Sequence, residues 1–157
     1  AFHGLGDLAY RLGDYAAARA YGQAARDRFQ ELGQLPAVVT PLCNVAQAEL
    51  RLGNVAAARR GTLEALSVAR SLGRARTILV STVVFAQILA EEGQTAQALA
   101  LFGLSRNHKA LSYELQVEID NEVARLGLPA AEVEAGLSAG AGLDLETVVE
   151  EILEGKW

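Results

Sequence analysis

A repeat of 40 residues constrains the fold of this chain more than any other feature of its sequence. The text RLGDYAAAR at residues 11–19 recurs as RLGNVAAAR at 51–59 and, with more changes, as EEGQTAQAL at 91–99. Self-similarity at a fixed period of this size is typical of stacked supersecondary units, in which each unit contacts its neighbours. Such a stack exposes a long surface. We therefore expect the chain to act by recognising a partner and not through an enclosed active site.

Each unit is predicted to be a helix, a tight turn and a second helix. Apolar residues at three- and four-residue spacing, among them Leu5 and Leu12, lead to Gly13, and an alanine-rich helical pattern follows it. Glycine after a helix adopts the left-handed conformation at little cost, and Asp14 in the first unit or Asn54 in the second is then placed to cap the next helix. In the second unit, Thr40 followed by Pro41 predicts a helix that starts there.

Small residues also recur in register with the period. They are Ala18, Ala58 and Ala98 in the second helices, and Gly6, Ala46 and Ala86 in the first helices. Only small side chains would let two helix backbones approach closely at these positions. The repeat therefore predicts where the helices of each pair meet.

These residues resemble the tetratricopeptide repeat family. The first unit carries the family's pattern as Leu5, Gly6, Gly13-Asp14-Tyr15, Ala18 and Ala25, and the second carries it as Leu42, Ala46, Gly53, Ala58 and Ala65. The usual period is about 34 residues, and HEAT or armadillo units run to about 40 to 47, but the motif favours a long tetratricopeptide variant. The resemblance implies an all-α, right-handed α-solenoid of antiparallel helix pairs, with three repeats at about 1–34, 35–74 and 75–106.

The repeat text fades near residue 106, and residues 107–157 are predicted to form a divergent helical cap. One helical pattern runs from Tyr113 to Leu126, and a short helix starts at Pro129. Residues 138–142 are predicted to be a loop, and Asp144 the N-cap of a last helix. A solenoid needs a cap of this kind, because its last unit otherwise exposes an apolar face.

The resemblance also implies where a partner would bind. In this family, first-helix side chains that point away from the second helix line a concave groove, and the candidate residues here are Asp7, Tyr10, Arg11, Asn44, Gln47, Arg51, Gln87 and Glu91, beside His3, Cys43, Val83 and Val84. Asp7, Gln47 and Gln87 are expected to form one row across the repeats, and Arg11, Arg51 and Glu91 a second. Two arginines in a row favour a partner carboxylate, gripped bidentately. The alternative is that these are solvated groove residues without a ligand.

Other classes of function are disfavoured by composition and motifs. The net charge is −5 and the basic residues are scattered, which argues against nucleic acid as a partner. The longest apolar stretch, 77–89, is too short to cross a membrane. The only Gly-Lys pair, at 155–156, lacks the rest of a phosphate-binding loop. His3 and Cys43 hold equivalent repeat positions, but two ligands do not make a zinc site. We expect a non-catalytic module without metal or cofactor, whose partner is a protein or peptide.

The wider context is predicted from weaker signals. A lone cysteine suits a reducing compartment, and we expect the cytoplasm. The chain opens at Ala1 inside repeat text, so we expect it to be cut from a longer protein. The 40-residue variant is similar to the C-terminal repeat arrays of STAND-type signalling ATPases and large bacterial transcription regulators, which implies a sensor or scaffold role. The alternative is a self-associating scaffold, because Phe2, Leu5 and Leu8 would be exposed if no repeat preceded them.

Overall fold

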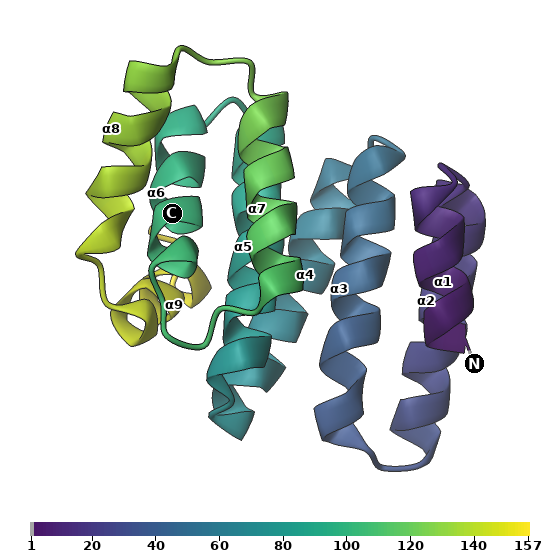
Figure 1. The fold of residues 1–157 in the computed structure, drawn as a ribbon. Coiled ribbons are helices and arrows are strands. Elements are labelled where there is room, and N and C mark those ends of the chain that lie inside the picture. The colour runs from purple at the N-terminus through teal and green to yellow at the C-terminus, as the bar shows by residue number, and fades with distance from the viewer. Residues whose placement is uncertain (1) are drawn as a thin grey trace.

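The computed structural model describes residues 2–157, and the side chains from residue 4 onward, so the expectations for the side chains of Phe2 and His3 lie outside the described residues. The described residues form nine helices and no strand (Figure 1). The helices are α1 (Phe2–Arg11), α2 (Tyr15–Glu31), α3 (Leu35–Arg51), α4 (Val55–Leu72), α5 (Ala75–Glu91), α6 (Thr95–Arg106), α7 (Tyr113–Arg125), α8 (Ala130–Ala141) and α9 (Leu145–Leu153).

The first six helices form three consecutive hairpins. α1 packs against α2, α3 against α4, and α5 against α6, while α2 and α4 each pack against the first helix of the next pair. Short turns join the members of each pair, which makes them antiparallel neighbours. The fold is therefore an all-α solenoid of antiparallel helix pairs, as the sequence predicted.

The anchor glycines of the repeat lie in these turns. Gly13, Gly53 and Gly93 have φ angles of 79°, 84° and 80°, in the left-handed region that glycine adopts without a steric penalty. Asp14 caps α2, because its side chain accepts a hydrogen bond from the backbone N–H of Ala17 at 3.0 Å. The predicted glycine turns and the Asp14 cap are thus confirmed. Asn54, predicted for the same role before α4, makes no side-chain cap hydrogen bond and donates to Glu49 at 2.6 Å.

The alanines of the repeat lie where the helices of a pair meet. Ala18, Ala58 and Ala98 are buried, as are Ala46 and Ala86 of the first helices. One contiguous core runs from α3 through the cap. One smaller cluster lies between α1, α2 and α3, and another between α3, α4 and α5. The small residues therefore mark helix contacts, as predicted.

Two predicted boundaries are wrong. The helix expected to start at Pro41 begins six residues earlier, at Leu35, and Pro36 occupies its first turn. A proline there is tolerated because the first N–H groups of a helix have no intrahelical partner. Pro41 then lies inside the helix, where burial of the neighbouring Val38 and Leu42 outweighs the lost hydrogen bond.

The second wrong boundary is the predicted loop at 138–142, because α8 continues to Ala141. Its glycines serve helix packing: a Cβ on Gly140 would overlap the carbonyl group of Ala100, and one on Gly103 would overlap the backbone at Leu137. α8 and α6 therefore approach as closely as two helix backbones can. The glycines that suggest a loop are the residues that permit this contact.

The three cap helices cover different sides of the array. α8 packs along α6, α9 packs against α4, and α7 packs against α6 and α5 (Figure 1). α9 buries Val148, Val149 and Ile152, and Asp144 caps it by accepting from the N–H of Thr147 at 3.0 Å. α7 does not simply extend the stack, since it is the cap helix that reaches the first helices of the repeats.

Candidate partner-binding groove

Helix α7 lies over the first helices α3 and α5, on the side where a concave groove was expected. Leu115 and Ile119 of α7 belong to the same buried cluster as Cys43, Val83 and Val84. The last three were predicted to line the groove, and each is almost completely buried. The chain therefore fills this part of its own groove, and Cys43, Val83 and Val84 are core residues.

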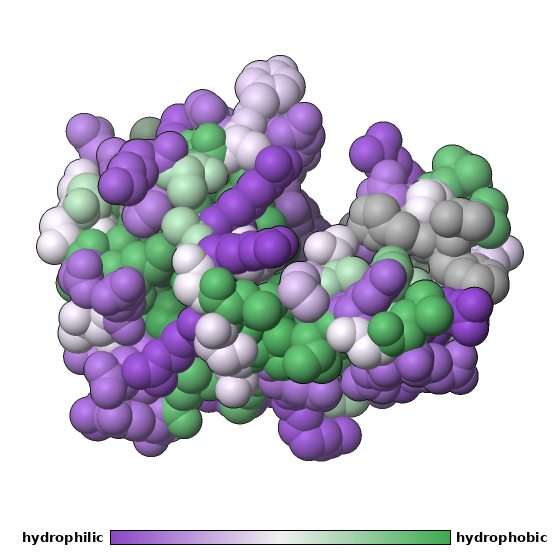
Figure 2. Space-filling view, turned by 90° about the horizontal axis from the view of Figure 1, so that it is seen from below, coloured by the Kyte–Doolittle hydropathy of each residue, from purple (hydrophilic) through white to green (hydrophobic). Residues whose placement is uncertain are grey.

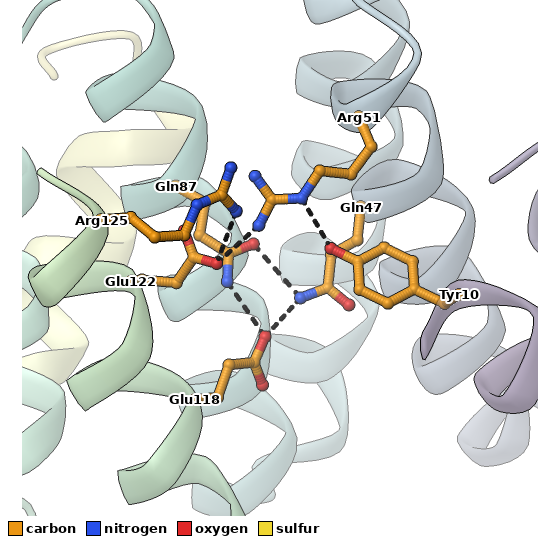
Figure 3. A network of polar contacts seen from close by, with 7 residues as sticks. All are labelled: Tyr10, Gln47, Arg51, Gln87, Glu118, Glu122 and Arg125. Atoms are coloured by element: carbon orange, nitrogen blue, oxygen red, sulfur yellow. Dashed lines mark hydrogen bonds and ion pairs between the residues drawn. The ribbon is translucent and has the colours of Figure 1, made fainter. Parts of the chain in front are cut away.

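The row formed by Asp7, Gln47 and Gln87 is only partly joined in space. The side-chain amide of Gln47 donates to that of Gln87 at 3.2 Å, across one full repeat. Both amides also donate to Oε1 of Glu118 on α7, that of Gln87 at 3.0 Å (Figure 3). Asp7 does not join them, since it pairs with Arg11 on its own helix. Two of the three row residues thus hold α7.

The row formed by Arg11, Arg51 and Glu91 is divided in a similar way. Arg51 Nη2 lies 2.6 Å from Oε1 of Glu122 on α7, and its Nε donates to the Tyr10 hydroxyl at 2.9 Å (Figure 3). The side chains of Arg51 and Glu122 are only 11% and 15% exposed. Arg125 also reaches Glu122, at 3.3 Å. This network ties α1, α3 and α7 together.

The remaining candidates lie at the edges of the network. Arg11 is 74% exposed and makes an i,i+4 ion pair with Asp7, at 3.1 Å. Glu91 is exposed at the end of α5. Asn44 is half-buried and lines a small hollow between α1 and α3. The predicted site residues therefore separate into two groups. Gln47, Arg51 and Gln87 are bonded to α7, with Tyr10 bonded in turn to Arg51, whereas Asp7, Arg11 and Glu91 are exposed.

Burial shifts the pKa values of the side chains in this network. Burial raises the pKa of Glu118, although the amides of Gln87 and Gln47 oppose this shift. Burial also raises the pKa of Tyr10, against the nearby Arg51 charge. Burial alone would lower the pKa of Arg51, but the Glu122 carboxylate and the Tyr10 hydroxyl outweigh it and raise that pKa. Arg51 is therefore held in its charged form.

An open groove remains between α1, α3 and α7, with a volume of about 580 Å³. Its lining comprises Asp7, Tyr10, Arg11, Gln47, Arg51, Tyr113, Glu114, Val117, Glu118, Asn121 and Glu122. Figure 2 shows the hollow between the N-terminal helix pair and the rest of the molecule. Tyr113 on its α7 wall is 78% exposed. Part of the expected groove is thus accessible, with α7 as one of its walls.

The α7 residues of this site were not predicted, because α7 was expected only as part of a cap. A signal for them is present in the sequence: Glu118 and Glu122 are one helical turn apart, and so are their partners Gln47 and Arg51. Equal spacing of donors and acceptors on two helices would have suggested that they face each other. Which helices face each other is decided by the path of the connecting loops, and the repeat does not encode that path.

Three further observations concern metal ions, the cysteine thiol and membranes. No group of three or more His, Cys, Asp or Glu side chains among them could hold a metal ion. Burial raises the pKa of the Cys43 thiol to about 12, against a weak contact with Ser81. Within residues 2–157, no helix is long and apolar enough to cross a membrane.

Comparison with known proteins agrees with the repeat text. Residues 1–71 match the sequence model of the tetratricopeptide repeat. The match ends just before the end of α4, so it covers the first two helix pairs and includes α1 and α3, which form two walls of the open groove. No curated protein and no solved structure matches the chain.

Proposed function

We propose that this chain is a non-catalytic module that binds a protein or peptide in the open groove between α1, α3 and α7. The observation that carries the proposal is the groove itself, which has a volume of about 580 Å³ and lies on first helices matched by the tetratricopeptide repeat. Repeats of this family generally mediate protein–protein interaction. An extended surface with polar side chains in register suits a peptide better than a small molecule.

The partner-binding residues of this proposal line the groove and do not bond α7 directly, and among them Tyr10 is half-buried and accepts from Arg51. Asp7, Tyr10 and Arg11 contribute from α1, and Tyr113 and Val117 contribute from α7. Tyrosines give a large contact area at low entropic cost, and they are enriched among residues that dominate binding energy. Gln47, Arg51 and Gln87 act mainly by holding α7 in place, because their side chains are already bonded to it.

The test selects short peptides from a displayed random library on the immobilised protein and measures their affinity for variants. Tyr113→Ala should weaken the selected peptides about tenfold or more, as expected for loss of a binding hot spot. Arg28→Ala, an exposed change on the outer helix α2, is the matched control. Helix content should be unchanged in both variants. Equal affinity of all three proteins for every selected peptide would refute the groove as the site.

The wider role we propose is that of the C-terminal sensor or scaffold part of a larger STAND-type signalling protein in the cytoplasm. The support is the resemblance of the 40-residue repeat text to the arrays of such proteins. In that setting, partner capture in the groove would be coupled to a nucleotide-binding domain elsewhere in the protein. The complete open reading frame tests this idea, and a frame without a phosphate-binding loop upstream of the array would refute it.

A second candidate function is self-association through the outer face of α1. Leu5 and Leu8 are exposed there, and Leu12 is 75% exposed at the end of the helix. Adjacent exposed leucines on one helix favour contact with another apolar face. Sedimentation velocity at rising concentration tests this candidate, with Leu8→Glu as the disrupting variant. A strict monomer at the highest concentration would exclude it.

A further inference from the structure

The open groove carries an excess of negative charge. Four carboxylates line it, from Asp7, Glu114, Glu118 and Glu122, against the two guanidinium groups of Arg11 and Arg51. The six ionised groups of the lining sum to −2, and to −1 when Arg125, which pairs with Glu122 at 3.3 Å, is counted with them. A concave surface with one prevailing sign of charge concentrates ligands of the opposite sign.

Both arginines are already matched by carboxylates of the chain. Arg51 is largely buried and pairs with Glu122 at 2.6 Å, so its charge is satisfied before any ligand arrives. Arg11 pairs with Asp7 at 3.1 Å. The carboxylate-binding arginine row expected from the sequence is therefore neutralised, and an acidic partner would meet the excess charge of the α7 wall.

Two carboxylates of the α7 wall form no ion pair among the residues with described side chains. Glu118 accepts two amide hydrogen bonds on Oε1, and no ion pair joins it to a cation among the residues with described side chains (Figure 3). Glu114 is exposed and likewise forms no ion pair in that part of the chain. The Arg51 charge favours the ionised form of Glu118, but burial outweighs it and raises the pKa of that carboxyl. A cation that entered the groove beside Glu118 would relieve this cost of burial.

The rest of the lining suits a long cationic side chain. The rings of Tyr10 and Tyr113 flank the groove, and aromatic faces attract ammonium and guanidinium groups. Val117 also lines the groove, beside Glu118 in the sequence, and its exposed side chain offers apolar surface to an aliphatic stem. Lysine and arginine combine these two properties, because their stems pack on apolar surface while their charge stays in polar surroundings.

From this geometry we infer that the groove between α1, α3 and α7 binds a peptide segment with lysine or arginine side chains, whose cation lies against Glu114 and Glu118. The inference rests on the proposed function and specifies the chemistry of its partner. The arginines Arg11 and Arg51 had suggested a negatively charged partner. The expected partner is instead positively charged, because the carboxylates of α7 belong to the same surface.

The test uses arrays of short peptides built on the same set of scaffolds, with lysine, glutamine or glutamate at two positions. The protein should bind the lysine set about tenfold or more tightly than the glutamate set, and added salt should reduce this preference. Glu118→Gln and Glu114→Gln should each reduce the preference for lysine several-fold. Glu118→Gln keeps an amide oxygen that can accept from Gln47 and Gln87, and Glu114 is exposed, so both variants should fold.

Controls separate this inference from the proposed function. Glu146→Gln changes an exposed carboxylate on α9, outside the groove, and should leave the lysine preference intact. Glutamate peptides that bind more tightly than lysine peptides, and that Tyr113→Ala weakens, would keep the groove as a binding site but overturn its cationic preference. If Tyr113→Ala affects no peptide set, the groove itself is wrong. Spermidine supplies the same amines without a peptide, and binding by spermidine as tight as that of the lysine set would overturn the assignment to a protein segment.

Discussion

The ion pair between Arg51 and Glu122 fastens α7 to the repeats, and breaking it from either side should have unequal effects. If Glu122→Ala removes the carboxylate, Arg51 loses its ion-pair partner and keeps the Tyr10 hydroxyl and the more distant Glu118 charge. The Arg51 side chain is only 11% exposed in the wild type. If Arg51→Ala removes the cation, Glu122 still pairs with Arg125 at 3.3 Å. The structure therefore predicts that losing Glu122 costs more stability than losing Arg51.

The magnitudes follow from what each change leaves unpaired. Loss of one partner from a buried ion pair destabilises by about 3–5 kcal/mol, and Glu122→Ala should lie near 3 because the pair is not fully enclosed. Arg51→Ala removes charged hydrogen bonds, but Glu122 keeps Arg125 as an ion-pair partner, so the loss of stability should be about 1.5–3 kcal/mol. The double variant should cost about 1–3 kcal/mol less than the two single changes together. For a chain of 157 residues, each kcal/mol corresponds to about 2–4 °C in melting temperature.

The assay is urea denaturation of the wild type, both single variants and the double variant. Circular dichroism follows all helices, and the fluorescence of Trp157, the only tryptophan, follows the cap, where its indole donates to Glu151 at 2.9 Å. Following both probes matters because repeat arrays can depart from two-state unfolding. Equal costs for the two single variants, or strict additivity in the double variant, would refute the unequal-pairing argument.

Three further predictions concern packing, thiol reactivity and pH. In the same urea assay, Gly140→Ala should destabilise the protein by about 1–3 kcal/mol or more, because the new Cβ would overlap the Ala100 carbonyl group. Gly61→Ala should instead stabilise α4 by about 0.5–1 kcal/mol, because its new Cβ would lie 3.7 Å from the nearest side chain and alanine favours a helix more than glycine does. Cys43 should resist alkylation in the native protein and react once urea unfolds it, because burial raises its thiol pKa to about 12; rapid native labelling in a mass-spectrometric assay would contradict this. Burial raises the Glu118 pKa, so the folded state holds that proton better than the unfolded chain and loses relative stability as pH rises above the ordinary value of 4.5. Glu118→Gln should therefore be more stable than wild type at pH 7 and no more stable at pH 3, and the opposite trend in melting temperature would show that the carboxylate is stabilising.

Much of the array could be predicted from the sequence because its signals are local. The glycines at 13, 53 and 93 specify left-handed turns within a few residues, and Asp14 and Asp144 cap the helices that follow them. The two errors in helix boundaries have a non-local cause. Pro41 and Gly140 each suggest a break, and in both places packing against another helix keeps the helix intact.

The candidate site could be predicted only in part for the same reason. The row positions of Gln47, Arg51 and Gln87 follow from the repeat, and the structure places Gln47 and Gln87 in contact across one period. Their partners Glu118 and Glu122 lie more than thirty residues further along the chain, outside the repeat. Spacing within a repeat carries no information about a helix that does not belong to it.

The helix pairs, their turns and the small residues between helices can be predicted from the sequence, because these properties depend on local backbone conformation and on a period that repeats. The placement of α7 over α3 and α5 cannot be predicted in this way, since it depends on contacts between residues far apart in the chain. This placement buries Val83 and Val84, pairs Arg51 with Glu122 and leaves an acidic groove beside α1. The repeat determines the stack of helix pairs, and α7 determines which part of the surface of that stack remains open and what charge the open groove carries.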